Sequence, residues 1–337
     1  MILKYNGGKM NVIVIGLGSM GKRRIRLMKA MRLPVDIIGI DNREDRRRIV
    51  AKEFNIRCYP SLEAAEKEEI IECAFICTSP LAHAELIRIC LEHGYHVFTE
   101  INLVSDQYKT NIEISEKKNL TLFLSSTPIY RDEMRKIIEI TNACDSGVSY
   151  VYHVGQYLPD WHPWEQYKEF FVGDSRTNGC REIFAIELPW LVKAFGNIKS
   201  IQSISKKLTS LDVPYNDTYL VQILHENGNT GVFAVDVVCR KPIRRLEVYN
   251  EDMYIEWEGT PKTLKQYSLI THNMESIECG TYRSEPGYSE FINETAYMNE
   301  IREFFEVIKG KKPEYTMKMD EQILKLIDEI ENVENVR

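Results

Sequence analysis

The sequence has few of the features that mark membrane, nucleic-acid-binding or metal-binding proteins. None of its apolar runs reaches the roughly 20 residues that cross a bilayer. Acidic residues outnumber basic ones by 50 to 43, for a formal net charge of −7, and this balance argues against a dedicated nucleic-acid binder. No two histidines stand at the spacing of a zinc site. We therefore expect no membrane, nucleic-acid or metal partner.

The cysteines do not suggest ligands either. There are eight, and no two of them form a C-x-x-C pair. Cys73, Cys77 and Cys90 lie in apolar runs, which predicts buried, reduced thiols in a cytoplasmic protein. The first residues lack the charged region, apolar core and cleavage site of a secretory signal. Residues 1–9 are expected to form a loose tail.

The first third of the chain alternates between two kinds of segment. Apolar runs occur at residues 12–15, 35–40, 73–77, 96–99 and 120–124, and amphipathic helical stretches separate them. Strand, helix, strand at this spacing predicts βαβ units and a parallel sheet covered on both faces. We expect a doubly wound α/β domain of the Rossmann type over residues 10–126.

After about residue 125 the runs become longer and alternate between apolar and polar residues, as in VSYVYHVGQYL and TYLVQILHENGNTGVFAVDVV. Such runs predict an open, mostly antiparallel sheet, with a tight turn at 227–229. Helices are expected at 130–142 and 181–195, and two more close the chain. The pattern predicts an α+β domain over residues 127–337, whose C-terminal helices are able to pack back on the first domain.

A glycine-rich turn follows the first predicted strand. The segment VIVIGLGSMG places Gly16, Gly18 and Gly21 between that strand and a helix. In this context the first glycine permits the tight turn, the second lets a diphosphate approach the backbone, and the third lets helix and strand pack closely. Ser19 and Met20 complete the turn, and the helix N-terminus faces the phosphates. A glycine turn that binds nothing, or a related methyl-donor-binding fold, is the alternative.

The second strand supplies the acid that such a site needs. Asp41 ends this strand, where a carboxylate would bind the ribose 2′-hydroxyl and repel a 2′-phosphate, so NAD(H) is favoured. Arg43 keeps NADP(H) open, because a guanidinium can pair with that phosphate. The intervening helix is rich in cations around an apolar stripe, which predicts a solvated outer face better than a nucleic-acid site. These cations are Lys22, Arg23, Arg24, Arg26, Lys29 and Arg32.

Two later strands also end on polar residues. The carboxyl ends of parallel strands border the ligand crevice in this kind of sheet. Thr78, Ser79 and Pro80 follow one strand, with His83 in the first turn of the next helix, and Glu100 ends the next strand. We expect these residues to border the nicotinamide ribose, although His83 is equally well explained as a helix-start residue bonded to the backbone.

Three stretches together resemble the Gfo/Idh/MocA family of nicotinamide-dependent oxidoreductases, which act mostly on sugars and cyclitols. They are GLGSMGKR, TSPLAH and EHGYHVFTE, and their order and spacing match through residues 11–126. The second half is compatible with that family. The resemblance implies NAD, or NADP, as cofactor, a sugar-like small-molecule substrate and a homo-oligomer, dimeric or tetrameric.

The chain departs from the family at its catalytic positions. Where members usually have Glu-Lys-Pro, this sequence has Glu100-Ile101-Asn102, so the glutamate near the nicotinamide is kept and the proton-handling lysine is lost. Asn102 remains as a polar group that could contact substrate.

A second departure lies on the predicted helix at 181–195. The family's first aspartate, histidine and last aspartate correspond here to Ile183, Ile186 and Pro189. The usual set of proton-handling residues is therefore absent by this resemblance.

Other polar residues are available to replace it. Trp161, His162, Trp164 and Tyr167 lie in one segment, where tryptophan faces suit sugar C–H surfaces and an imidazole suits proton transfer. A rigid Pro/Trp-rich loop explains the same residues without any ligand.

Arg181 and Glu182 begin the helix, and Glu182 shares a face with Ile186 at i, i+4 spacing. Glu187 lies further round the helix and is a weaker candidate. A purely structural Arg181–Glu182 arrangement is the alternative.

Three functions are compatible with these residues. The leading hypothesis is an NAD(P)-dependent oxidoreductase that acts on a sugar hydroxyl, with His162, Tyr167 or Glu182 handling the proton. A sensor or scaffold that binds cofactor and sugar without turnover is favoured by the losses at Ile101 and Ile186. Non-redox sugar chemistry with transient use of NAD is the third.

An oligomer surface is sought in the predicted hairpin at 217–239. Its first strand alternates Tyr219, Val221 and Ile223, and its second alternates Phe233, Val235 and Val237. The same pattern fits a sheet face covered by the domain's own helices.

Overall fold

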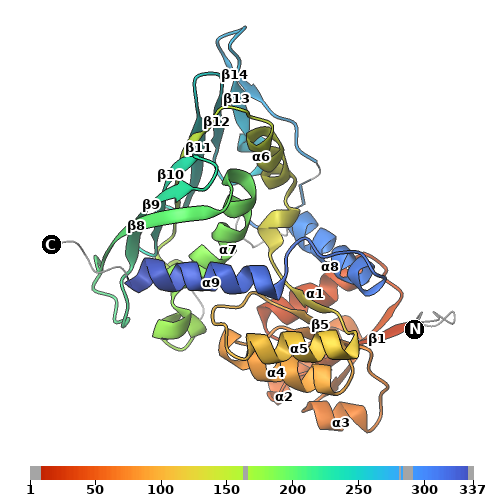
Figure 1. The fold of residues 1–337 in the computed structure, drawn as a ribbon. Helices are drawn as coiled ribbons and strands as arrows, with labels where there is room; N and C mark the ends of the chain where they lie inside the picture. Colours follow the sequence, from red (N-terminus) through yellow and green to blue (C-terminus); the bar gives the residue numbers. More distant parts are fainter. Residues whose placement is uncertain (1–8, 162–165, 281, 284–290, 333–337) are drawn as a thin grey trace. The chain divides into compact units, whose positions relative to one another are not determined.

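The computed structural model describes residues 9–161, 166–280, 282–283 and 291–332. The chain divides into two compact units, each described by itself (Figure 1). The first unit comprises the chain up to Ser125 together with Tyr297–Met319, and the second comprises Ser126–Ala296 together with the chain from Asp320 on.

The first unit is built on a six-stranded parallel sheet of order β3-β2-β1-β4-β5-β6. Its strands are β1 (Met10–Ile15), β2 (Val35–Ile40), β3 (Arg57–Tyr59), β4 (Cys73–Ile76), β5 (His96–Thr99) and β6 (Leu122–Leu124). The chain order reverses between β1 and β4, the switch point at which doubly wound sheets bind ligands. The predicted Rossmann-type sheet is confirmed. The pattern missed β3, because this strand has three residues and none is buried.

Helices and the aromatic core complete this unit. The helices are α1 (Ser19–Ala30), α2 (Glu44–Phe54), α3 (Leu62–Glu66), α4 (Pro80–Glu92), α5 (Tyr108–Lys118) and most of α8 (Glu294–Ile308). Phe75, Phe98 and Phe123 come from adjacent strands and stack with ring centroids 4.6 and 5.3 Å apart. Phe304 of α8 meets all three edge-on, at 5.2 to 5.8 Å. Residues near the end of the chain therefore fill the core of the N-terminal sheet.

The second unit contains an eight-stranded sheet of order β14-β13-β12-β11-β7-β10-β9-β8. Among the described strands of this second sheet, only β7 and β10 pair in parallel. The strands are β7 (Ser149–Gly155), β8 (Ile198–Lys206), β9 (Thr218–His225), β10 (Thr230–Asp236), β11 (Ile243–Tyr249), β12 (Tyr254–Trp257), β13 (Lys265–Tyr267) and β14 (Met274–Ser276). The mostly antiparallel sheet is confirmed, with the predicted turn at Gly228 (φ +90°).

The remaining helices are α6 (Asp132–Asn142), α7 (Gly179–Phe195) and α9 (Met317–Asn332). Short 3₁₀ segments occur at Thr127–Tyr130, Leu158–Asp160, Phe171–Gly173, Ser175–Thr177 and Pro261–Thr263. No helix in the described part of the chain has the length and apolarity needed to span a membrane.

Helix α7 covers one face of the second sheet (Figure 1). The ring of Phe184 meets Tyr219 and Phe233 edge-on, at 5.6 and 5.5 Å. The alternating residues of the predicted hairpin are therefore buried under the unit's own helix. The opposite face carries exposed apolar side chains, namely Val151, Ile204, Leu220, Leu224, Val232 and Tyr249.

Candidate cofactor and catalytic sites

At two of the three glycines of the glycine turn there is no room for a side chain. Gly16 has φ +91°, and a Cβ built there would lie 2.7 Å from the carbonyl oxygen of Cys77. A Cβ at Gly21 would lie 1.9 Å from the carbonyl oxygen of Gly16. At Gly18 the nearest atom would be 3.7 Å away, so that position is open above the backbone. The turn thus packs tightly on its own strands and leaves room for a ligand above Gly18, as a dinucleotide diphosphate requires.

Asp41 holds this turn against the end of β2. Its Oδ2 accepts a hydrogen bond from the amide of Leu17 (2.8 Å), and its Oδ1 accepts one from the amide of Arg43 (2.9 Å). The carboxylate is 7% exposed and remains beside the turn, where a ribose would lie.

The arginines beside Asp41 differ in where their side chains lie. Arg43, which the sequence offered as a phosphate partner, forms an exposed ion pair with Asp45 at 2.6 Å. Arg46 comes one helical turn later, and its Nη1 lies 3.7 Å from Asp41 Oδ2. The sequence pattern gave no reason to prefer Arg46, because four arginines crowd residues 43–48.

The segment after β4 borders the same turn. A Cβ at Gly16 would lie 3.1 Å from the Cγ2 of Thr78, which is half-buried. Ser79 is exposed at the N-cap of α4, and Pro80 occupies the first turn. The structure therefore brings Thr78 to the glycine turn, as expected for two strands that flank the switch point. Ser19 is exposed and Met20 half-buried at the start of α1.

His83 and Asn102 are bonded to each other. His83 is 1% exposed, with Nδ1 2.8 Å from Asn102 Oδ1 and Nε2 3.0 Å from the carbonyl oxygen of Thr78. The Asn102 amide also donates to the hydroxyl of Tyr108 at 2.8 Å. Burial lowers the pKa of His83, and the two contacts of its ring tie the β4 and β5 loops together.

Glu100 is anchored by a buried arginine. Nε of Arg24 donates to Glu100 Oε1 at 2.6 Å, and Nη2 donates to Glu100 Oε2 at 2.9 Å. The same Nη2 reaches Glu300 Oε2 at 2.8 Å, and Ser125 Oγ donates to Glu300 Oε1 at 3.0 Å. Arg24 is 0% exposed and Arg23 only 5%, so the prediction of a solvated outer face is wrong for both.

This cluster sets two buried carboxylates against one buried guanidinium. Burial raises the pKa of Glu300, and the attraction of Arg24 opposes that rise. Burial likewise raises the pKa of the Cys77 thiol, whose Sγ lies 3.7 Å from Glu100 Oε1. Both oxygens of Glu100 are therefore engaged inside the first unit. Their partner, Arg24, could not be recognised from the sequence pattern.

In the second unit, His162 and Trp164 lie outside the described residues. Trp161 is half-buried, and its Nε1 donates to the carbonyl oxygen of Gln156 at 3.0 Å. A Cβ at Gly179, the first residue of α7, would lie 3.5 Å from the indole of Trp161. Tyr167 is half-buried in a turn. Trp161 thus sits at the N-terminus of the helix that carries the other candidates.

Arg181 is committed to ion pairs within the second unit. Its Nη2 lies 2.7 Å from Asp328 and its Nη1 lies 2.5 Å from Glu331, both on α9. The amide of Arg181 also donates to the N-cap Asn178 at 2.7 Å. The side chain is 7% exposed, so its position is that of an anchor between two helices.

Glu182, the next residue, is in a different situation. The residue is half-buried, its Oε2 is buried, and no hydrogen bond satisfies that oxygen among the described residues. Burial raises the pKa of Glu182 to about 7. Ile186, one turn later on the same face, is also only partly buried. A carboxyl with a pKa near neutrality has the property required of a general acid or base.

Glu187 points to the sheet and is fully paired. Its Oε2 accepts from the hydroxyl of Tyr152 and from Nε1 of Trp190, each at 2.7 Å. Its Oε1 accepts from Nη2 of Arg244 at 2.6 Å. The carboxylate is 0% exposed. It joins α7 to β7 and β11 and is not available for chemistry.

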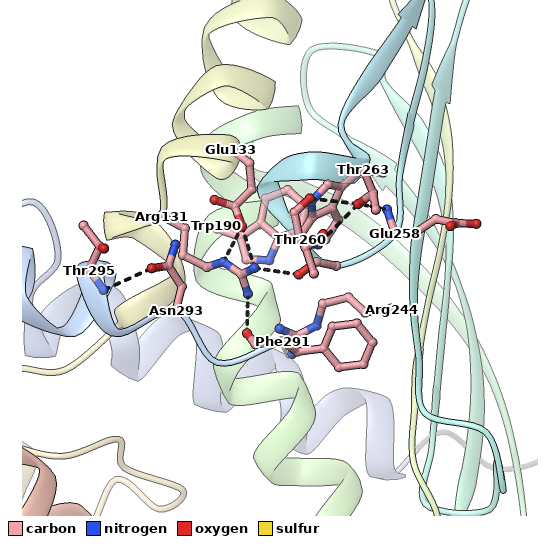
Figure 2. Close-up of polar contacts among 12 residues, drawn as sticks. Arg131, Glu133, Trp190, Arg244, Glu258, Thr260, Thr263, Phe291, Asn293 and Thr295 are labelled. Carbon is pink, nitrogen blue, oxygen red and sulfur yellow. Dashed lines mark hydrogen bonds and ion pairs between the residues drawn. The ribbon is translucent and has the colours of Figure 1, made fainter. Parts of the chain in front are cut away.

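Another buried arginine of the second unit is Arg131 (Figure 2). Arg131 donates to Glu133 Oε1 at 2.8 Å, to the carbonyl oxygen of Gly259 at 2.7 Å and to that of Phe291 at 3.3 Å. Its guanidinium lies 5.4 Å from the ring centre of Trp257. These contacts hold the start of α6 to the loop after β12.

Comparison with known proteins agrees with this geometry. The Gfo/Idh/MocA family model, described as an oxidoreductase family with an NAD-binding Rossmann fold, matches residues 10–125. No curated protein sequence matches the chain.

Solved structures share the fold along nearly the whole chain. An oxidoreductase from Thermotoga maritima has a TM-score of 0.79 at 15% identity, covering 97% of each chain. The UDP-N-acetylglucosamine 3-dehydrogenase GnnA from Acidithiobacillus ferrooxidans has a TM-score of 0.74 at 15% identity, covering 96% of this chain and 97% of the other. The WlbA dehydrogenase from Bordetella pertussis, solved with NADH and UDP-GlcNAcA, has a TM-score of 0.75 at 13% identity, covering 96% and 95%.

Proposed function

We propose that the chain oxidises or reduces a sugar-derived hydroxyl, on the premise that residues 10–125 match the Gfo/Idh/MocA family of NAD-binding oxidoreductases. The observation that carries this proposal is the glycine turn, which is closed at Gly16 and Gly21, open above Gly18 and bonded to Asp41. Two solved proteins of the same fold are described with nucleotide sugars. We therefore name sugars, amino sugars and nucleotide sugars as the substrate class.

The residues of the first unit fit the cofactor. The backbone at Gly18 and the N-terminus of α1 would hold the diphosphate, and the carboxylate of Asp41 would accept the ribose hydroxyls. Thr78 borders the turn from β4. The bound nicotinamide would supply a hydride acceptor or donor, and the protein must move the accompanying proton.

Glu182 is the best candidate for the residue that accepts and donates that proton. Ile101 and Ile186 cannot exchange a proton, and Arg181 is held by Asp328 and Glu331. Glu182 has an oxygen without a hydrogen-bond partner and a pKa of about 7. As a carboxylate it would take the proton of the substrate hydroxyl during oxidation and return it during reduction. His162 and Tyr167 remain the second choices.

The substrate contacts are proposed on the aromatic segment. Trp161, with its indole at the start of α7, and Trp164 would cover the C–H faces of a sugar ring. The amide of Asn102 is shared with His83 and Tyr108, so its contribution would be to fix the loop beside Glu100.

The experiment is a turnover assay on the purified chain with NAD⁺, NADP⁺ and a panel of sugars, amino sugars and nucleotide sugars. Reduced nicotinamide should accumulate with at least one of them. Glu182→Gln should lower kcat by about 10²-fold or more, the range of general acid–base catalysis. Glu258→Gln, an exposed carboxylate in the same unit, is the control. Full activity of the Glu182→Gln variant would remove this residue from the mechanism.

A binding protein is the second candidate, because Glu100 is engaged by Arg24 and positions 101 and 186 are apolar. It predicts cofactor affinity without turnover. Non-redox chemistry with transient NAD use predicts product without net reduced nicotinamide. The same assay, with product analysis, separates all three.

We also propose a homo-oligomer formed through the open face of the second sheet. This face carries exposed Val151, Leu220, Leu224 and Val232 on neighbouring strands. Single exposed apolar residues are common on protein surfaces, but a group of them on one sheet face indicates an interaction surface. Light scattering of the wild type and of a Leu220→Glu variant tests this: the variant should have the lower mass.

A further inference from the structure

We propose that Arg46 is the residue that determines how the adenosine end of the cofactor is recognised, and that it lets the site accept a 2′-phosphate beside Asp41. This inference rests on the proposed function, because it assigns the cofactor specificity of the same site. It predicts a protein that binds both NAD(H) and NADP(H).

Two distances place the guanidinium of Arg46. Its Nη1 lies 3.7 Å from Asp41 Oδ2. It also lies 3.7 Å from the point where a Cβ at Gly18 would stand. The positive charge therefore lies between the acid and the open position of the glycine turn, where the ribose of a dinucleotide would be bound.

The neighbouring arginines are engaged elsewhere. Arg43 pairs with Asp45, and Nη1 of Arg47 donates to the carbonyl oxygens of Asp41 and Asn42, at 2.8 and 2.9 Å. Arg48 is exposed, about 200° round the helix from Arg46. Of the arginines at 43–48, Arg46 is thus the one beside both the acid and the turn.

The Asp41 carboxylate should also repel a phosphate less than a carboxylate without hydrogen-bond donors or a nearby cation would. Asp41 already accepts hydrogen bonds from the amides of Leu17 and Arg43. The guanidinium of Arg46 offsets the negative charge of Asp41. The side chain of Arg46 is 38% exposed, so it can turn toward a phosphate. Guanidinium groups bind phosphate through two parallel hydrogen bonds. Asp41 would then bind ribose hydroxyls in NAD(H), and Arg46 would bind the 2′-phosphate in NADP(H).

The test compares two nucleotides that differ by this phosphate. Calorimetry on the full chain measures the Kd of 5′-AMP and of 2′,5′-ADP, and then of NADH and NADPH. In the wild type both members of each pair should bind. Arg46→Gln should raise the Kd of 2′,5′-ADP and NADPH by about tenfold, which corresponds to about 1.4 kcal/mol, and change that of 5′-AMP and NADH by less than about threefold. Arg48→Gln, the same charge change on the same helix, should leave all four unchanged.

Three results would overturn the inference. They are equal losses for both members of a pair in Arg46→Gln, no loss for either, or a wild type that binds 5′-AMP and NADH but neither phosphorylated partner. The last result leaves the proposed oxidoreductase intact with NAD alone. Failure of the wild type to bind any of the four ligands would instead overturn the cofactor half of the proposed function as well.

Discussion

Nε of Arg24 lies 2.6 Å from Oε1 of Glu100, and neither residue is more than 7% exposed. This glutamate directly follows β5, and the family resemblance predicts that it lies near the nicotinamide. It is bound by a side chain from the helix that follows the glycine turn. The contact connects two parts of the cofactor-binding unit through charge, so a change in one is expected to disturb the other.

Removal of the Arg24 guanidinium should lower the free energy of unfolding of the protein. Arg24→Met leaves Glu100 and Glu300 buried without a cation, and we expect a loss of about 3–5 kcal/mol in the free energy of unfolding at neutral pH. Urea unfolding measures it. Lys29→Met, on an exposed position of the same helix, should cost less than about 0.5 kcal/mol. Equal losses in the two variants would show that the buried cluster adds little.

The glycines of the turn should separate folding from binding. Gly21→Ala places a methyl group 1.9 Å from the Gly16 carbonyl oxygen, and the forced backbone shift should cost about 2–3 kcal/mol of stability. Gly18→Ala meets nothing closer than 3.7 Å, so stability should stay within about 0.5 kcal/mol. The Kd for NADH should nevertheless rise about tenfold or more, because the methyl group blocks the diphosphate. Unchanged NADH affinity in Gly18→Ala would contradict this site.

Glu182 should make stability depend on pH. Burial raises its pKa in the folded chain to about 7 from 4.5. Between those values the folded state holds a proton that the unfolded state has lost, so this contribution to stability is complete below pH 4.5 and is lost as the pH rises through 7. Because the side chain is partly exposed, we expect Glu182→Gln to gain about 1–2 kcal/mol over the wild type between about pH 5 and pH 8. Urea unfolding across that range tests it, and a constant difference would rule out the raised pKa.

The paired carboxylate on the same helix should behave differently. Glu187→Gln leaves Arg244 without its charge partner and weakens the bonds from Tyr152 and Trp190, so we expect a loss of about 2–4 kcal/mol. Glu258→Gln, an exposed neighbour of this region (Figure 2), should change stability by less than about 0.5 kcal/mol. Thermal unfolding compares the two. A negligible effect of Glu187→Gln would mean that its three donors find other acceptors.

The local pattern of the sequence was enough to predict the parallel sheet and the glycine turn. Buried strands such as β2 and β5 read as continuous apolar runs, and their predicted bounds agree with the structure. The short strands β14, at the edge of its sheet, and β13, next to it, were missed because their three residues each are at most half-buried. Their pairing depends on neighbours and not on their own composition.

The charge partners could not be predicted, because they join residues far apart in the chain. Arg24 looks like one of several cations on an amphipathic helix, and its partners are 76 and 276 residues away. Arg46 likewise differs from its neighbours only in the direction of its side chain. In contrast, the i, i+4 relation of Glu182 to Ile186 is local, so the sequence could single out that residue.

The dependence of the first unit on α8 bears on how the protein is made. Phe304 and Glu300 reach the core beside Phe98 and Arg24 from the last tenth or so of the chain. A nascent polypeptide that has just left the ribosome with the glycine turn complete would still lack both. Its cofactor-binding unit cannot be completed until residues 300–304 have been translated, so premature stop codons just before α8 should yield aggregation-prone fragments and not a working nucleotide-binding domain.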